Sequence, residues 1–249
     1  MDMNGGYQSR PLPPRMSGPT AAPASSPQAV PWGPRDVWVG VGVAALSLAA
    51  GWGLAFLVRA LSVDPNVDLW VALFPNLFEL LFIAVAWWFS VRKYQVSLRA
   101  LGFVGFRPSI LALGFALLWA VYLVVGAYNY LIQGFGLEMQ TDVTPVLEEL
   151  ASPWPLFFTA AVVAPVSEEV FFRGFVFAGL RSRYGWRGAA AISSILFAVA
   201  HAQLAFIPPA FLLGFLFAYL YERSGSLWPA LILHMAVNTL ALSVAMAIA

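Results

Sequence analysis

Cysteine is absent from the 249 residues of this chain. Its absence excludes disulfide bonds, thiolate metal ligands and a cysteine nucleophile. Charged residues are also scarce, at 10% of the chain, whereas roughly a quarter is typical of soluble domains. Hydrophobic residues make up 61% and the mean hydropathy is +0.79. Because this number of polar side chains is too small to cover a surface that faces water, we expect most of the surface to face lipid. The net charge of +1 gives no indication of nucleic-acid binding.

The first part of the chain lacks a long apolar run. Residues 1–34 are rich in proline, glycine and serine and contain the basic residues Arg10 and Arg15. A signal peptide needs an apolar segment, which is missing here. We therefore predict a disordered, proline-rich cytosolic tail over 1–34 and one membrane domain over 35–249.

Apolar stretches dominate the remainder of the chain. A helix of about 20 residues crosses a bilayer, and the sequence predicts an all-α, polytopic bundle of about seven spans. The fifth and sixth stretches are short and meet at Pro208-Pro209, so these two could form a hairpin that crosses only in part. The predicted spans are 37–58, 69–90, 109–132, 154–180, 189–205, 207–221 and 227–248.

The charges between the spans predict the orientation. Basic residues concentrate in alternate loops, and the positive-inside rule places such loops in the cytosol. The chain then runs N-in and C-out, with the acidic loops 59–68 and 133–153 outside. The basic residues on the cytosolic side are Arg92, Lys93, Arg99, Arg107, Arg181, Arg183, Arg187 and Arg223.

Few ionisable residues lie inside the predicted spans, and both histidines of the chain are among them. Each costs a few kcal/mol if it faces lipid, so we expect these residues to face the bundle interior. They are Glu79, Glu168, Glu169, Arg173, His201 and His234.

The spacing of these residues suggests a division of roles. Glu169 and Arg173 are four residues apart on one helix, at ion-pair spacing, whereas Glu168 points about 100° away from Glu169. We therefore interpret Glu169–Arg173 as a structural pair and Glu168 as the chemically available carboxylate. The spacing is also four for Phe197 with His201 and for His234 with Asn238, and Phe197 is expected to pack against the site.

Polar residues from three of the predicted spans lie at similar depths in the membrane. At 1.5 Å per residue, Glu168 lies about 18 Å and His201 about 20 Å from the cytosolic ends of their helices. His234 and Asn238 lie about 10 and 16 Å from theirs. We therefore expect the four side chains to converge in a cavity that opens more readily to the cytosolic side.

This set of residues fits peptide hydrolysis in a membrane. Glu168 could accept a proton from water, with His201 holding that water, and His234 with Asn238 could donate hydrogen bonds to the oxyanion. A zinc site on Glu168, His201 and His234 is the main chemical alternative. The helical zinc-protease signature H-E-x-x-H is absent, so we favour chemistry without a metal and expect no cofactor.

Three motifs together resemble the CPBP family of intramembrane proteases. They are Glu168-Glu169-Val170-Phe171-Phe172-Arg173, Phe197-x-x-x-His201 and His234-x-x-x-Asn238, and they lie within residues 154–248. The family comprises CAAX prenyl proteases and bacteriocin-processing and immunity relatives. The resemblance implies a glutamate-dependent endopeptidase in which Glu168 and His201 activate water and His234 and Asn238 form the oxyanion site. Glu169, Arg173 and Phe197 would support them.

The resemblance also sets expectations about partners and alternatives. It implies a peptide or protein substrate, prenylated in one branch of the family, that is cleaved near the cytosolic side. The short loops favour a prokaryotic plasma membrane, with lipids as further partners. A membrane scaffold or immunity protein that uses the same cavity for binding is the alternative. A proton-coupled carrier is disfavoured because the spans show no internal repeat.

Overall fold

The computed structural model describes residues 27–61, 75–139, 150 and 152–248, and every regular element in these ranges is a helix. The first helices are α1 (Pro34–Leu61), α3 (Pro75–Trp87) with its π-helical continuation η1 (Trp88–Arg92), and α4 (Pro108–Gln133). A short 3₁₀ helix, η2 (Leu98–Leu101), precedes α4. All three α-helices begin at a proline, whose missing N–H costs nothing in the first helical turn.

The next helical segment carries the first motif and changes its winding along its length. It runs through α6 (Trp154–Phe158), π-helical η3 (Thr159–Val163), α7 (Ala164–Glu168), π-helical η4 (Glu169–Phe177) and α8 (Ala178–Ala200). Pro165 cannot donate a backbone hydrogen bond, and a wider turn directly before it accommodates this loss. Gly185, with φ 67° and ψ 167°, then reverses the chain within α8. The predicted spans 154–180 and 189–205 therefore lie on opposite sides of Gly185.

Two helices complete the chain after a 3₁₀ turn, η5 (Leu204–Phe206). They are α9 (Ile207–Ser224) and α10 (Trp228–Ile248). Gly225 ends α9 in a left-handed conformation (φ 65°), and its N–H donates to the carbonyl of Tyr221, a standard glycine C-cap.

The expected transmembrane bundle is confirmed. Among the described residues, five helical stretches are long and apolar enough to cross a membrane, and Trp154–Ala200 is one of them. The shorter apolar helix Leu80–Arg92 corresponds to the second predicted span, whose first residues, 69–74, lie outside the described part. Because Gly185 divides Trp154–Ala200, each of the seven predicted spans corresponds to a helix.

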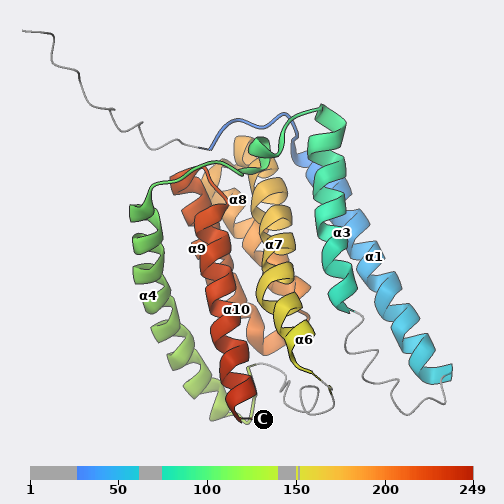
Figure 1. Ribbon diagram of the computed structural model, residues 1–249, viewed down its shortest axis with the longest axis vertical. Helices are drawn as coiled ribbons and strands as arrows, with labels where there is room; N and C mark the ends of the chain where they lie inside the picture. Colours follow the sequence, from blue (N-terminus) through green and yellow to red (C-terminus); the bar gives the residue numbers. More distant parts are fainter. Residues whose placement is uncertain (1–26, 62–74, 140–149, 151, 249) are drawn as a thin grey trace, which may run out of the picture.

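The helices run roughly along one axis, and the described chain starts and finishes at opposite ends of the bundle (Figure 1). The loop between η1 and α4 lies at the end where α1 begins, and α10 finishes at the other end. We call the first the basic end, because the basic residues named above for the cytosolic side lie there. We call the other the C-terminal end. The N-in orientation itself stays a prediction.

Contacts between distant segments close the basic end. Asp36 near the start of α1 accepts hydrogen bonds from Lys93 and Tyr94. Arg181 binds Glu222 through two hydrogen bonds of 2.6 and 2.8 Å. Because these pairs join α1, α8, α9 and the loop after η1, they fix the helices relative to one another at this end.

The folded domain begins before the predicted boundary at residue 35. Trp32 is 2% exposed, and its indole Nε1 donates a 3.0 Å hydrogen bond to the carbonyl of Phe175. The aromatic ring therefore anchors residues just ahead of α1 in the core, which corrects the predicted extent of the disordered tail. Residues 1–26 of that tail lie outside the described part.

Candidate active site

The site is centred on the ion pair between Glu169 and Arg173. Arg173 Nη1 donates a 2.9 Å hydrogen bond to Glu169 Oε1, and both side chains are almost completely buried. Arg173 Nη2 also donates to the carbonyl of Gly214 in α9, at 3.0 Å. The pair expected from the i,i+4 spacing is thus present, and it links η4 to α9 as well as bracing its own helix.

His234 lies between both glutamates of the first motif. Its Nδ1 is 2.9 Å from Glu169 Oε1, and its Nε2 is 3.4 Å from Glu168 Oε2. The histidine is 4% exposed, and the Glu168 side chain is 13% exposed. The sequence predicted that Glu168 and His234 converge in one layer with His201 and Asn238, but it did not predict that one imidazole would contact both carboxylates.

These contacts define the protonation pattern of His234. Glu169 is paired with Arg173 and is therefore an acceptor, so the adjacent Nδ1 carries the hydrogen. Nε2 then faces Glu168 Oε2, at 3.4 Å. Glu169 therefore orients the imidazole, while Glu168 is the carboxylate next to its other nitrogen.

Aromatic rings fix the plane of His234. Phe217 of α9 stacks on the imidazole at a centroid distance of 4.9 Å, and Phe197 of α8 approaches its edge at 5.7 Å. Phe197 also lies under the Arg173 guanidinium, 4.5 Å from its central carbon. The packing expected for Phe197 is therefore present, whereas Phe217 was not predicted, since its sequence neighbours form no motif.

His201 approaches from the end of α8. Its Nδ1 lies 2.8 Å from the carbonyl of Phe197. Because a carbonyl only accepts, Nδ1 carries the hydrogen and the neutral ring presents Nε2 as an acceptor. His201 also packs against the rings of Phe197 and Phe206, at 4.8 and 5.3 Å. The hydrogen-bond and ion-pair partners described for Glu168 and His201 do not join them directly.

Asn238 is held one turn beyond His234 on α10. Its Nδ2 donates a 2.8 Å hydrogen bond to the carbonyl of Ala160 in the π-helical turn η3. The widened turn before Pro165 thus supplies the carbonyl that orients the amide. The second amide hydrogen has no role in this bond and can serve another acceptor.

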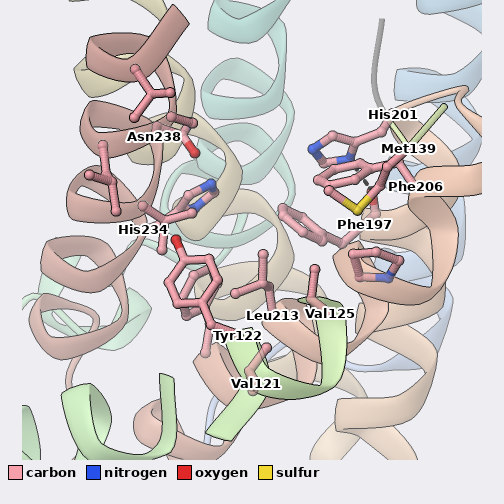
Figure 2. A pocket seen from close by; sticks show the side chains of 16 residues that line it. Val121, Tyr122, Val125, Met139, Phe197, His201, Phe206, Leu213, His234 and Asn238 are labelled. Carbon is pink, nitrogen blue, oxygen red and sulfur yellow. Dashed lines mark hydrogen bonds between the residues drawn. The ribbon is translucent and has the colours of Figure 1, made fainter. Parts of the chain in front are cut away.

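A cavity of about 380 Å³ joins the two histidines and Asn238. Figure 2 shows His201 and Phe206 on one side of it and His234 with Asn238 on the other, while Tyr122 and Val125 of α4 also line it. Glu168 is not part of this wall and reaches the cavity through its contact with His234.

The cavity extends toward the C-terminal end of the bundle. On α10 its wall starts at His234 and continues to Val244, toward the C-terminal end of the helix. Which side of the membrane this end faces depends on the predicted orientation, so the expectation of a more cytosolic opening stays a prediction. The depth estimate measured distances along single helices, and it carried no information about which end the packed aromatic side chains fill.

A zinc site is the chemical alternative to a site without a metal. Among the described residues, no group of three or more His, Asp or Glu side chains is arranged to hold a metal ion. The zinc alternative on Glu168, His201 and His234 stays untested. Glu79 lies in α3, and its side chain is outside the described part.

Fold and site together define a multi-pass helical membrane protein with a buried cluster of carboxylates and histidines. Residues 144–240 match the family model described as "Type II CAAX prenyl endopeptidase Rce1-like". This segment contains all three motifs, so the family resemblance expected from them is confirmed.

Two bacterial membrane proteins are also similar to this chain. YdiL of Bacillus subtilis (strain 168), named as a proposed membrane peptidase, is 27% identical over 137 residues, which cover 51% of this chain and 56% of YdiL. The membrane-embedded CAAX protease MroQ of Staphylococcus aureus (strain USA300) is 32% identical over 133 residues, which cover 51% of this chain and 53% of MroQ. The chain thus spans about half the length of the curated relatives it matches. No solved structure matches it.

Proposed function

We propose that this protein is an intramembrane endopeptidase that uses Glu168 to activate water. The observation that carries the proposal is the arrangement of His234, which contacts Glu168 and Glu169 and lines the cavity that also contains His201 and Asn238. The motif-bearing segment matches a family of CAAX prenyl endopeptidases, which supports hydrolysis over simple binding.

The hydrolytic step follows from the chemistry of these groups. Glu168 takes a proton from water as the water oxygen attacks the carbonyl carbon of the scissile bond. The same proton is then delivered to the amide nitrogen as the C–N bond breaks, which leaves a free carboxylate and a free amine. His234 Nε2 lies 3.4 Å from Glu168 Oε2, so the imidazole is placed next to the carboxylate that takes the proton.

His201 is suited to hold the attacking water. Since its Nδ1 donates to the Phe197 carbonyl, its Nε2 lone pair can accept a hydrogen bond from that water. His201 and Glu168 belong to different helices, so a water between them would be oriented by both groups.

Asn238 and His234 are suited to stabilise the oxyanion. One amide hydrogen of Asn238 is bound to the Ala160 carbonyl, which leaves the second to donate into the cavity. His234 can donate through Nε2 when that nitrogen carries a proton. Donors fixed before the reaction stabilise developing negative charge without reorganisation.

Glu169 and Arg173 act as positioning residues in this proposal. The guanidinium keeps Glu169 an acceptor, and Glu169 holds His234 through Nδ1. Gly214 matters for the same reason, because its carbonyl binds Arg173. A misplaced imidazole costs rate even where the reacting groups are intact.

The proposed substrate is a peptide or protein at the membrane. The names of the matched family and of MroQ mention CAAX substrates, so prenylated peptides belong in the first set to be tested. Glutamate chemistry without zinc is part of the same proposal, and no step above requires a metal.

The test is cleavage of a fluorogenic peptide panel, prenylated and unprenylated, by detergent-purified protein with and without a chelator. Glu168→Gln should lower the rate at least about 100-fold, the lower range for loss of a general base. Glu222→Gln is the matched control: it changes a half-buried glutamate at the basic end and should retain cleavage. Retained cleavage in Glu168→Gln contradicts the proposed role, and loss on chelation would establish a metal site instead.

A binding protein would give a different result on the same panel. In the scaffold or immunity alternative, no peptide is cleaved by the wild type, and Glu168→Gln leaves the cellular phenotype intact. Cleavage by wild type with loss in the variant excludes that alternative.

A further inference from the structure

The cavity occupies only one half of the bundle. Its wall on α10 starts at His234 and continues through Val237 and Ala241 to Val244. At 1.5 Å per residue, this wall extends about 15 Å from the histidine. Ile248 ends the helix, so the cavity reaches the last turns of α10 at the C-terminal end.

The other side of His234 is closed by packed side chains. Every residue from Glu169 to Leu180 is buried. Phe175, Phe177 and Leu180 are 0% exposed, and Leu220 of α9 and Leu233 of α10 are likewise 0% exposed. A peptide could not pass this layer without displacing several aromatic rings, and packed interiors do not yield in that way.

The C-terminal end is open by comparison. Leu240 and Val244 line the cavity and are nevertheless 56% and 54% exposed. A side chain that both lines a cavity and is exposed marks its mouth. Ala241 lies between them and is also exposed, and its small side chain leaves the entrance wide.

The side chains that line the cavity determine which kind of peptide segment can bind in it. Apart from the polar floor, the lining is largely apolar, and its larger aliphatic residues are Val121, Val125, Leu213, Val237, Leu240 and Val244. Among the described residues that line the cavity, none is a carboxylate, a lysine or an arginine. An apolar peptide segment fits such a wall, whereas a charged one would lose its hydration there.

The charge distribution then assigns a side of the membrane to the mouth. The basic loops lie at the closed end, and the positive-inside rule places them in the cytosol. The mouth near Val244 is at the opposite end of the bundle, which faces away from the cytosol.

We propose that the substrate enters this site from the extracytoplasmic side and lays an apolar segment along α10 between the scissile bond at His234 and Val244. The inference rests on the proposed endopeptidase function for the identity of the occupant. It replaces the cytosolic cleavage position that the sequence suggested.

Single cysteines test the side of access, because the native chain has no cysteine and gives no background. Val244→Cys and Ala241→Cys mark the mouth, and Arg183→Cys marks the basic end, where Arg183 is exposed. A membrane-impermeant maleimide applied to intact bacterial cells that express the full chain should label the mouth variants and spare Arg183→Cys. Inside-out vesicles should give the reverse. Labelling of the mouth variants from the cytosolic side alone overturns the proposal.

Blocking the mouth tests whether the substrate uses it. Modification of Ala241→Cys with a bulky maleimide should lower cleavage about 100-fold relative to the same variant unmodified, as expected when a substrate is displaced from its reacting position. Ser243→Cys is the matched control, because Ser243 is a small, exposed residue at similar depth that does not line the cavity. Equal cleavage by modified and unmodified Ala241→Cys would show that the substrate takes another route.

The two measurements separate the two proposals. Labelling reports the orientation of the mouth without any catalysis, so its result stands even if no peptide is cleaved. Absence of cleavage by wild type counts against the endopeptidase, whereas cleavage that survives blocking counts only against the entry route.

Discussion

The two ends of the helix bundle are built differently around one cluster of polar residues. Toward the basic end, the side chains of Phe175, Phe177 and Leu180 are 0% exposed. Toward the C-terminal end, Leu240 and Val244 line a cavity and remain more than half exposed. This difference allows a membrane protein to hold a cluster of polar side chains rigidly while one side of the cluster borders a cavity.

Buried residues at the basic end hold the side chain of His234 in position. Arg173 and Glu169 are buried at this end, and from there Glu169 holds His234. His201 and Asn238 lie on the open side, where each side chain is hydrogen-bonded to one backbone carbonyl and has no ion pair among the described residues. Variants at the closed end should therefore change stability first, and variants at the open side should change cleavage first.

The largest effect on stability is expected from Arg173→Met. It leaves the buried Glu169 carboxylate without its cation, and removing one partner of a buried pair costs about 3–5 kcal/mol. The double variant Glu169→Gln/Arg173→Met should be more stable than the single variant, because no unpaired charge remains. Thermal unfolding in detergent measures both, and a double variant as unstable as the single one would show that charge is not the cause.

Asn238→Leu should have the largest effect on catalysis apart from Glu168. Loss of one oxyanion donor costs about 100- to 1000-fold in kcat, while the nearly isosteric leucine keeps the volume of the side chain. Thr239→Leu, at the exposed neighbour, is the control and should cleave as wild type does. Peptide kinetics decide the matter: a rise in KM with unchanged kcat would make Asn238 a substrate-binding residue only.

A single methyl group should distinguish the two ends. In Gly179→Ala the new Cβ would lie 2.6 Å from Trp32 and from Val37, an overlap that costs about 1–3 kcal/mol. In Gly126→Ala the Cβ would meet nothing within 4 Å, and alanine in a helix gains up to about 1 kcal/mol over glycine. Thermal midpoints should therefore fall for the first variant and hold or rise for the second. A fall of equal size in both would contradict the difference in packing.

The smallest effect is expected at the surface of the basic end. The hydrogen bond to Asp36 raises the pKa of Lys93 above its ordinary value of 10.5. The stability from this contact is present below pH 10.5 and is lost as the pH rises through the raised pKa. Lys93→Met should therefore lower the thermal midpoint slightly at neutral pH, by less than Gly179→Ala, and the gap to wild type should close in strong alkali. A gap that widens with pH would contradict the contact.

The sequence predicted those parts of the site that depend on spacing within one helix. The Glu169–Arg173 pair follows from the i,i+4 geometry, and the seven apolar stretches became helices because a bilayer leaves no other partner for the backbone. Local chemistry was enough for these features.

The contacts between helices could not be predicted from the sequence. The bond from His234 to Glu169, the ring of Phe217 on His234 and the carbonyl of Ala160 on Asn238 depend on how helices rotate about their axes. The direction of the cavity depends on where aromatic side chains from several helices meet. The burial of Trp32 depends on a bond to Phe175, 143 residues later in the chain.

A cysteine scan along α10 tests whether the polar cluster forms the floor of a cavity that is open at one end only. Single cysteines at Ala230, Leu233, Val237, Ala241 and Val244 would be reacted with a water-soluble maleimide in detergent. The structure predicts fast reaction at 237, 241 and 244, which line the cavity, and almost none at 230 and 233, which are 0% exposed. Equally fast reaction at 230 and 233 would mean that water enters from the basic end as well, so that the cavity is not closed there.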